Sequence, residues 1–572
     1  MDTPEPSVLL LPDDPFFHEL FNRHTQDPEA CVIYDRASER SVTPYHFLVD
    51  ILQTVDRVRR ILSQGEETPS ANNIFVCVLV PYGYEYAVTI LALRALGLTA
   101  VPVSEAILPE EFEYFVQVCN ATYLITIPSL QDHAESLLSG TSLAILTLQL
   151  SLSITQPLPV LRKPLQVSET WNTDRGAILL FTSGTSGPPK GVLHTHRSVY
   201  IGAKEWIETY GLTRDDRILL PWNSHWCAGF MMLSGCILAG TCAEICPTVF
   251  NPAWFWERIK AAEVTFLHLT PSLLGPAIEW YAREVIRQSP QEVEGYLVGS
   301  RRLRTVVIGS TTVPTPVADF WIEKEVKFDL HYGCTECWMI AATDWRKSEG
   351  FTPRHVGKLV SGVETTLASE SEGEMAIKSQ GLFQKYLSAN PHIMNNVFDD
   401  NGYYLTGDFI RRGHDASLFI LGRASQDVVR FSGWKVFTLD VEDALLNIPH
   451  IAAAVVLGVD DDTVGQRVSA LIVTKPQLEQ SLPQKVSLAT LRRTLALEQQ
   501  LPVYKLPTLM RVLAPGEEIP RTNSGKVSKA SARKKFFASD DLDSEKVEAW
   551  DLNRKDEDLP TRAWDWAGIG AQ

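Results

Sequence analysis

Residues 180–191, which read LFTSGTSGPPKG, carry the strongest structural signal in this chain. They follow an apolar, strand-like segment at residues 177–180. The glycines let the backbone approach a ligand closely, the hydroxyls and N–H groups can donate hydrogen bonds, and Lys190 supplies positive charge. A P-loop NTPase would need Gly-x4-Gly-Lys-Ser/Thr, whereas Gly191 follows the lysine here. Alone, the stretch predicts either a phosphate-binding loop of another type or an ordinary surface loop.

Four more segments follow this loop in a fixed order. They are Tyr332–Glu336 (YGCTE), Tyr404–Asp408 (YLTGD), Gly422–Lys435 (GRASQDVVRFSGWK) and Pro520–Lys526 (PRTNSGK). Together the five segments resemble the signature motifs of the adenylate-forming superfamily of AMP-binding enzymes, which includes acyl-CoA synthetases, peptide-synthetase adenylation domains and beetle luciferases. Within it, the chain is most similar to the malonyl-CoA and medium-chain acyl-CoA synthetase branch. That branch has the same extra residue after Arg423 and a similar segment at residues 458–468.

Strand-like and helical runs alternate along the N-terminal part of the chain. Extended patterns at residues 74–80, 99–103 and 123–127 alternate with helical spacing at residues 84–96 and 108–119. Such alternation is typical of βαβ units, which build a parallel sheet. The sequence therefore predicts an α/β fold.

The resemblance also implies how the chain divides into domains. We expect a large N-terminal AMP-binding domain with parallel or mixed sheets and helices at residues 1–422, and a small, mobile α+β C-terminal domain at residues 423–537. The family pivot between the two is usually Asp or Lys, and either Ser425 or Gln426 takes that place here. Residues 538–572 form an acidic tail that we expect to be disordered, although its tryptophans could dock it on the body or on a partner.

The composition excludes several classes of function. A net charge of −17 argues against a general nucleic-acid-binding or anionic membrane surface. The nine cysteines are an odd number spread through apolar segments, which indicates a reducing compartment, and the close pairs among them lack the other ligands of a zinc site. No secretory signal, peroxisomal C-terminal signal or membrane-spanning run is evident. We therefore expect a cytoplasmic enzyme whose oligomeric state the sequence leaves open.

Adenylation of a carboxylate requires its oxygen to attack the α-phosphorus of ATP while pyrophosphate leaves, so two anions must be held together and the growing charge neutralised. The resemblance implies the residues for this task. Lys526 would reach the carboxylate and the α-phosphate, Thr335 would contact the α-phosphate, and Glu336 would help to hold Mg²⁺. The β- and γ-phosphates would be held by Thr182, Ser183, Gly184, Thr185, Ser186, Gly187 and Lys190.

The resemblance further implies sites for the rest of the nucleotide and for CoA. The adenine slot would consist of Gly309, Ser310, Thr311 and Tyr332, and Gly333 would also bind the nucleotide. Asp408 would accept hydrogen bonds from both ribose hydroxyls, for which a carboxylate is a natural acceptor, and Arg423 would reach the same sugar. After rotation of the small domain, the loop at Ser432, Gly433 and Trp434 would bind CoA, whose thiol attacks the acyl-adenylate.

The choice of acid is constrained by residue types that are missing. Peptide-synthetase adenylation domains hold the substrate amine with an aspartate, but residues 221–230 (PWNSHWCAGF) contain no acid, so an amino acid is not expected. Malonate-activating relatives carry a base soon after a Val-Pro-Thr segment, but residues 270–276 (TPSLLGP) contain none, so burial of a second carboxylate would be costly. An apolar pocket with one polar handle is predicted from His225, Trp226, Gly229 and Phe230. We expect a medium-chain, branched or aromatic monocarboxylic acid of fatty-acid or secondary metabolism.

The chain is therefore predicted to be an ATP-dependent acyl-CoA ligase that uses ATP, Mg²⁺ and CoA. An enzymatic alternative is an acyl-AMP ligase that delivers the acyl group to a carrier-protein partner. An alternative of another class is a nucleotide-binding pseudoenzyme with a regulatory or scaffolding role, which the unusual pivot and the acidic tail would allow. The presence of Lys526, Glu336 and Asp408 argues against that alternative.

Overall fold

The chain forms two compact units in its computed structural model. Unit 1 contains the described residues of 8–182, 188–364 and 377–404, and unit 2 those of 365–376 and 405–552. The structure describes residues 8–62, 74–138, 143–149, 160–162, 173–182, 188–246, 250–311, 313–344, 346, 351–390, 392–395, 397–475, 486–522, 526–538, 542 and 546–552. The domain boundary predicted after residue 422 stays a proposal.

The first sheet of unit 1 has the strand order β20–β10–β9–β5–β4–β6–β7. Its strands are β4 (Phe75–Leu79), β5 (Thr99–Pro102), β6 (Tyr123–Thr126), β7 (Ala144–Thr147), β9 (Gly176–Thr182), β10 (Lys190–Thr195) and β20 (Lys385–Leu387). Strands β9, β5, β4, β6 and β7 pair in parallel, whereas β10 and β20 extend the sheet in antiparallel pairs. Helices α3 (Tyr84–Ala95) and α4 (Pro109–Cys119) connect the parallel strands, so the predicted βαβ units and the α/β fold are confirmed.

The second sheet of unit 1 has the strand order β17–β16–β15–β14–β13–β11–β12–β2–β3. Its strands are β2 (Ile33–Asp35), β3 (Arg40–Val42), β11 (Arg217–Leu220), β12 (Cys242–Ile245), β13 (Phe266–Leu269), β14 (Thr305–Ile308), β15 (Phe328–Tyr332), β16 (Ala341–Ala342) and β17 (Lys358–Leu359). Strands β11, β13, β14 and β15 pair in parallel. Their carboxyl ends therefore meet at one edge, which is where α/β proteins commonly bind ligands.

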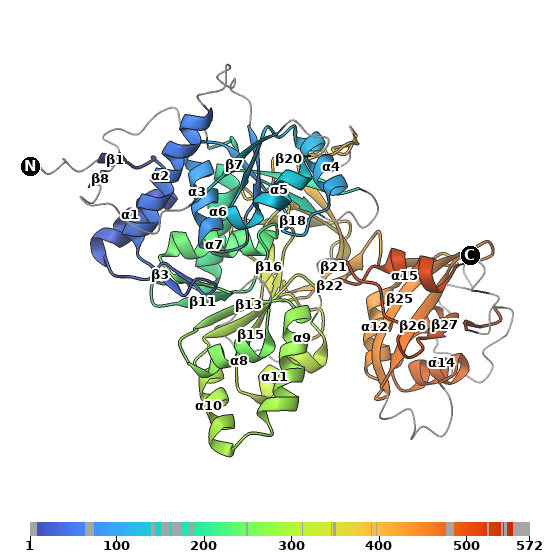
Figure 1. The fold of residues 1–572 in the computed structure, drawn as a ribbon. Helices are drawn as coiled ribbons and strands as arrows, with labels where there is room; N and C mark the ends of the chain where they lie inside the picture. The colour runs from blue at the N-terminus through green and yellow to red at the C-terminus, as the bar shows by residue number, and fades with distance from the viewer. Residues whose placement is uncertain are drawn as a thin grey trace, which may run out of the picture. The chain divides into compact units, whose positions relative to one another are not determined.

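Helices pack around and between the two sheets (Figure 1). The others in unit 1 are α1 (Pro15–Gln26), α2 (Pro44–Leu62), α5 (Gln131–Leu137), α6 (His196–Tyr210), α7 (Cys227–Ala239), α8 (Pro252–Lys260), α9 (Pro271–Trp280), α10 (Pro290–Arg301) and α11 (Thr315–Glu323). Helix α6 begins at a capping box, in which Thr195 and Ser198 exchange hydrogen bonds between side chain and backbone. Helix α7 is apolar on all sides and packs against α1 and α6, as expected for a buried helix. None of the described helices is both long enough and apolar enough to cross a bilayer.

Unit 2 begins with a sheet of strand order β18–β19–β21–β22 and continues with the order β24–β23–β26–β27–β28, where β25 pairs with β26. The strands are β18 (Glu364–Leu367), β19 (Glu372–Lys378), β21 (Tyr404–Arg412), β22 (Leu418–Arg423), β23 (Val428–Phe431), β24 (Trp434–Phe437), β25 (Ile451–Asp461), β26 (Gly465–Thr474), β27 (Leu509–Val512) and β28 (Glu548–Ala549). Its helices include α12 (Thr438–Leu446), α14 (Leu488–Leu497) and α15 (Lys529–Phe536). Buried side chains of β25 and β26 pack against α12, α14 and α15.

Part of the segment that the sequence predicts to be a disordered tail is ordered. Strand β28 pairs with β27, and the Arg492 guanidinium lies 4.3 Å from the centroid of the Trp550 ring. Arg467 also donates a hydrogen bond of 2.6 Å to the Trp550 carbonyl. The acidic composition of the segment does not predict these contacts, because only one aromatic ring and one short strand make them. Trp564 and Trp566 lie outside the described residues.

Candidate active site

A buried acidic side chain in unit 1 is surrounded by groups that favour its ionised form. Glu336 follows β15 and is 7% exposed, and its Oε1 atom lies 3.3 Å from the Lys190 ammonium. Tyr386 on β20 donates a hydrogen bond of 2.6 Å to the same oxygen, and the hydroxyls of Tyr386 and Tyr404 are 3.1 Å apart. Burial alone would raise the pKa of Glu336, but Lys190 and Tyr386 together hold it below its ordinary value. Glu336 can therefore offer a carboxylate to a hard cation.

The predicted phosphate loop connects two antiparallel strands. Thr182 ends β9 and Lys190 begins β10, and these two residues are partners in the ladder. The Lys190 ammonium also lies 3.7 Å from the centroid of the Tyr386 ring. The base of the loop thus sets the lysine beside Glu336 and Tyr386. The loop residues Ser183, Gly184, Thr185, Ser186 and Gly187 lie outside the described residues.

A histidine that sequence reasoning missed supports the Thr335–Glu336 segment. His194 on β10 is fully buried, and its Nε2 atom lies 2.7 Å from the Thr335 carbonyl oxygen. Because a carbonyl only accepts, Nε2 carries the proton, and Nδ1 can accept from the Ser198 hydroxyl at 3.0 Å. Burial lowers the pKa of His194 to about 4, so the ring is neutral at neutral pH. The ring also packs on Trp338, with the two centroids 3.8 Å apart.

The predicted adenine slot lies at the carboxyl ends of two neighbouring parallel strands. Gly309–Thr311 follow β14 and Tyr332 ends β15. A side chain at Gly333 would place its Cβ 1.9 Å from the Trp338 carbonyl oxygen, so only glycine fits there. Ser310 has a φ of +72°, a conformation that residues other than glycine rarely adopt. The second sheet therefore brings these predicted residues to one edge.

In unit 2, the predicted ribose-binding residues form a rigid pair. Asp408 on β21 and Arg423 on β22 are partners in the ladder, and the guanidinium donates hydrogen bonds of 2.8 Å and 3.2 Å to the two carboxylate oxygens. An ionised carboxylate accepts hydrogen bonds only, so it is chemically suited to a diol. The arrangement fixes the orientation of Asp408 before any ligand binds.

The predicted pivot lies next to a half-buried ionic cluster of unit 2. Ser425 and Gln426 are in the turn after β22, and the Gln426 amide donates a hydrogen bond of 3.0 Å to the carbonyl of Arg423. Lys529 on α15 lies 2.6 Å from Asp427 and 2.8 Å from Glu442 on α12. Burial alone would lower the pKa of Lys529, but the two carboxylates raise it above its ordinary value. The cluster therefore joins the end of the turn to both helices.

The predicted CoA-binding residues form a tight hairpin. Ser432 and Gly433 connect β23 to β24 with φ values of +47° and +83°, which is the backbone of a type I′ turn. The Trp434 ring stacks on Tyr504 at a centroid distance of 4.5 Å. A Cβ built on Gly433 meets no atom within 4 Å, so the tip of this hairpin is open among the described residues.

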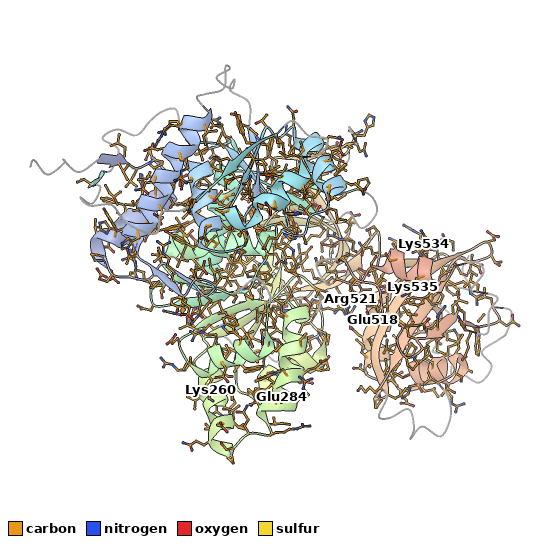
Figure 2. All side chains as sticks on the ribbon, in the orientation of Figure 1. Lys260, Glu284, Glu518, Arg521, Lys534 and Lys535 are labelled. Carbon is orange, nitrogen blue, oxygen red and sulfur yellow. The ribbon has the colours of Figure 1, made fainter. Side chains whose placement is uncertain are left out.

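Lys526 lies in a short loop of unit 2. The Thr522 amide donates a hydrogen bond of 2.7 Å to the carbonyl of Lys526, and Arg521 forms a β-bridge with Val527. The side chain of Lys526 is exposed. Figure 2 shows Arg521 where this loop begins and Lys534 on α15. Residues 523–525 lie outside the described residues.

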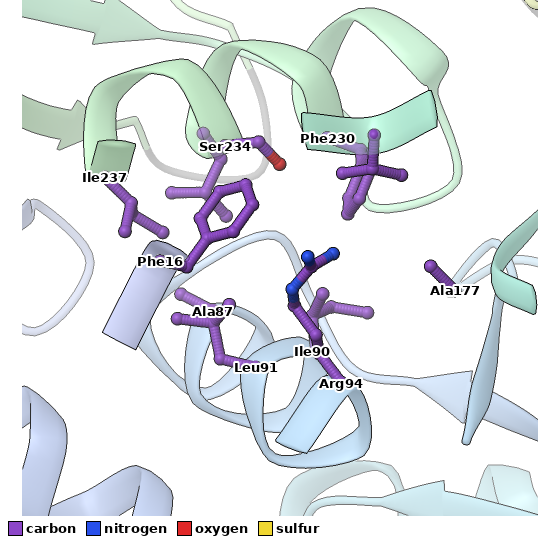
Figure 3. Close-up of a pocket in the computed structure, with 11 residues that line it drawn as sticks. Phe16, Ala87, Ile90, Leu91, Arg94, Ala177, Phe230, Ser234 and Ile237 are labelled. Carbon is purple, nitrogen blue, oxygen red and sulfur yellow. The ribbon is translucent and has the colours of Figure 1, made fainter. Parts of the chain in front are cut away.

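The residues predicted to line the acid pocket lie where the chain enters α7. His225 and Trp226 are half-buried, and burial lowers the pKa of His225 to about 4. A Cβ at Gly229 would lie 2.7 Å from the Cβ of Trp222, so the glycine allows this tryptophan to approach α7 closely. Phe230 lines a cavity of about 20 Å³ between α7 and α3 (Figure 3), and its ring centroid lies 6.1 Å from that of Trp338. Its surroundings are those of a core residue.

Sequence reasoning missed several residues that the fold brings to the site. His194, Tyr386 and Trp338 contact the Thr335–Glu336 segment or its neighbours from other strands and turns. No motif marks them, because their roles depend on pairing between distant parts of the chain. For Trp338, the only sequence signal was its position two residues after the YGCTE segment.

Comparison with protein-family models finds two matches. Residues 50–387 match the AMP-binding enzyme model, and residues 440–526 match the model of the AMP-binding enzyme C-terminal domain. The acyl-CoA ligase oryP of Aspergillus oryzae is 30% identical over 533 residues, which cover 92% of this chain and 93% of that protein. The mitochondrial malonate–CoA ligase ACSF3 of Xenopus laevis is 28% identical over 538 residues, which cover 86% of this chain and 88% of that protein.

A solved structure has the same fold. The crystal structure of ATP-bound MatB from Rhodopseudomonas palustris superposes with a TM-score of 0.74 at 20% sequence identity. The superposition covers 91% of this chain and 98% of that chain. The predicted architecture of a large N-terminal and a small C-terminal α/β part is thereby confirmed.

Proposed function

This chain belongs to the AMP-binding enzyme family, and we propose that it is an ATP-dependent ligase that joins a monocarboxylic acid to CoA through an acyl-adenylate. The predicted class, an AMP-forming acid–thiol ligase, is confirmed by this membership. The observation that carries the proposal is the ionised, buried Glu336 beside Lys190 and Tyr386, at the base of the loop that resembles the family's phosphate loop.

The charges of this group suit ATP with a magnesium ion. Lys190 would neutralise the β- and γ-phosphates, and Glu336 would supply a carboxylate oxygen to the ion. The part of the chain that the structure describes has no cluster of three or more His, Cys, Asp or Glu side chains able to hold a metal. Phosphate oxygens and water would therefore complete the coordination. When bound, the ion would neutralise charge on the leaving pyrophosphate.

The residues of unit 2 would complete the adenylation reaction. Asp408, fixed by Arg423, would accept the two ribose hydroxyls. Lys526 would neutralise the charge that develops as the carboxylate attacks the α-phosphate, which a long, flexible ammonium side chain can do. Removal of one such preorganised charge typically lowers the rate by about 10²- to 10³-fold.

CoA is the proposed acceptor of the acyl group. The hairpin tip is open at Gly433, where a Cβ built on the glycine meets no described atom within 4 Å, and this suits the approach of a long thiol substrate. A carrier protein is the alternative acceptor. Formation of acyl-CoA by the purified chain would support the proposal, whereas release of acyl-AMP that only a carrier thiol consumes would favour the alternative.

The proposed acid is a medium-chain, branched or aromatic monocarboxylic acid. This proposal is supported by the aromatic residues at the start of α7, where the ring centroids of Trp222 and Trp226 are 6.0 Å apart. His225 is neutral at neutral pH, because burial lowers its pKa to about 4. A neutral pocket offers no charge to a second carboxylate. A cytoplasmic location is proposed as well, although the Xenopus laevis relative is named as mitochondrial.

The test is exchange of labelled pyrophosphate into ATP with a panel of carboxylic acids that includes malonate. We expect exchange with a monocarboxylic acid, a loss of about 10²- to 10³-fold in Lys526→Ala, and no loss in Lys534→Ala, which removes an exposed lysine of α15. Near wild-type exchange in Lys526→Ala would remove this lysine from the mechanism. Malonate as the best substrate would refute the proposed acid class.

A further inference from the structure

Several buried ring nitrogens without hydrogen-bond partners lie together at the carboxyl edge of the second sheet. His268 on β13 is 3% exposed, and neither its Nδ1 nor its Nε2 has a hydrogen-bond partner among the described residues. The same holds, within the described part of the chain, for Nε1 of Trp222, which is 4% exposed, and for Nδ1 of His331. Buried polar groups in folded proteins nearly always have a hydrogen-bond partner, so we expect a bound molecule to provide one for these nitrogens.

These rings are in mutual contact. The His268 ring centroid lies 5.3 Å from that of Trp222, 5.3 Å from that of His331 and 4.9 Å from that of Trp206 on α6. His331 is additionally hydrogen-bonded to the backbone of Trp338 through its ring. The atoms left without partners are therefore held in place by packed aromatic neighbours.

The cluster lies between two parts of the predicted active site in unit 1. A Cβ built on Gly309, the first residue of the predicted adenine slot, would lie 3.2 Å from His268 Nε2. On the other side, Trp222 touches Gly229, which is one of the residues predicted to line the acid pocket. Trp222 and His268 therefore link the predicted acid pocket to the predicted adenine slot.

The charge state of the cluster decides which chemical group it can bind. Burial lowers the pKa of His268 well below its ordinary value, and burial lowers the pKa of His331 to about 4. Each neutral imidazole has one donor and one acceptor nitrogen, and the indole of Trp222 only donates. A hydroxyl or a carbonyl oxygen matches this set. A carboxylate does not match it, because neutral rings would leave a buried charge uncompensated.

We propose that Trp222 and His268 bind a hydroxyl or carbonyl group carried on the chain of the acid that this enzyme activates. The proposal rests on the proposed function and narrows its substrate class from plain monocarboxylic acids to hydroxy- or oxo-acids. His268 would be the specificity-determining residue, since it can donate to a carbonyl and either donate to or accept from a hydroxyl. A site that hydrogen-bonds a substrate group discriminates strongly against the analogue without it, because its own polar atoms then stay unpaired.

The test compares acids in matched pairs by pyrophosphate exchange. The probes are octanoate against hydroxy- and oxo-octanoates, and phenylacetate against hydroxyphenylacetate. We expect kcat/KM to be at least about tenfold higher for the oxygenated member of the best pair. His268→Leu should lower this ratio to near one, and Trp222→Phe, which keeps the aromatic ring but removes the N–H, should lower it in the same direction. His392→Leu, at an exposed position, should leave the ratio unchanged.

The outcomes separate this inference from the proposed function. Plain acids activated as well as their oxygenated partners by the wild type would overturn the inference and leave the proposed function standing. An unchanged ratio in both Trp222→Phe and His268→Leu would also overturn it, and so would a crystal structure with bound acid in which only water contacts His268. Absence of exchange with every acid would overturn the proposed function and this inference with it.

Discussion

Replacement of His194 by leucine should weaken adenylation without exchanging any residue expected to touch the substrates. The substitution removes the hydrogen bond of 2.7 Å from Nε2 to the Thr335 carbonyl and the bond of 3.0 Å between Nδ1 and Ser198. Leaving the buried Thr335 carbonyl without its donor costs about 1–3 kcal/mol of free energy. If the transition state bears this loss in full, kcat/KM falls by about 5- to 150-fold.

The matched variant is His194→Gln, because the glutamine amide can place an N–H near the position of Nε2. We expect His194→Gln to recover most of the activity that His194→Leu loses, and the loss in His194→Leu to be larger in kcat/KM for ATP with Mg²⁺ than for the acid. Pyrophosphate exchange measures both constants, and thermal unfolding of each variant shows whether the fold is intact. Equal losses in the two variants at unchanged Tm would refute the role of the hydrogen bond. Wild-type activity in His194→Leu would refute it as well.

Three further predictions concern packing, charge and pH. Gly333→Ala would bring a Cβ to 1.9 Å from a backbone oxygen, so its Tm should drop by several degrees or more; an unchanged Tm would contradict this. Lys529→Met leaves two half-buried carboxylates without their cation and should lower the free energy of unfolding in urea by about 1–3 kcal/mol, whereas the exposed control Lys535→Met should change it little. The contribution of His194 to the free energy of unfolding should fall as the pH drops from about 6.5 toward 4, because its pKa is about 4 when folded and ordinary when unfolded, so the unfolded chain binds more protons there. Urea titrations of the wild type and His194→Leu across this range check this, and a difference between the two that does not change with pH would contradict it.

Local sequence patterns predicted much of the fold because they act over short distances. The helical spacing at residues 84–96 became α3, and the extended pattern at residues 99–103 became β5. The motif residues Asp408 and Arg423 were found on strands that pair with each other, and a carboxylate and a guanidinium in such a motif can be recognised without knowledge of the fold.

Residues that act across the fold could not be predicted in this way. His194 bonds to a residue 141 positions away, and Tyr386 bonds to one 50 positions away. Phe230 was predicted to line the acid pocket, and this stays a prediction; because α7 is apolar on every side, its periodicity alone could not show that Phe230 also lines a cavity against α3. His268 has no motif around it, and only the burial of both ring nitrogens reveals that it needs a partner.

The contrast between Glu336 and the nearby histidines shows how this fold controls charge. All are buried, and burial disfavours the charged form of each. Glu336 stays ionised because Lys190 and Tyr386 stabilise its carboxylate, whereas burial outweighs the groups that favour the charged form of His194. A cation that approaches with the phosphates would therefore meet a single carboxylate and neutral rings rather than repelling imidazolium groups. The neutral rings can at the same time donate to backbone and substrate oxygens, so the burial that keeps them neutral also suits them to positioning and recognition.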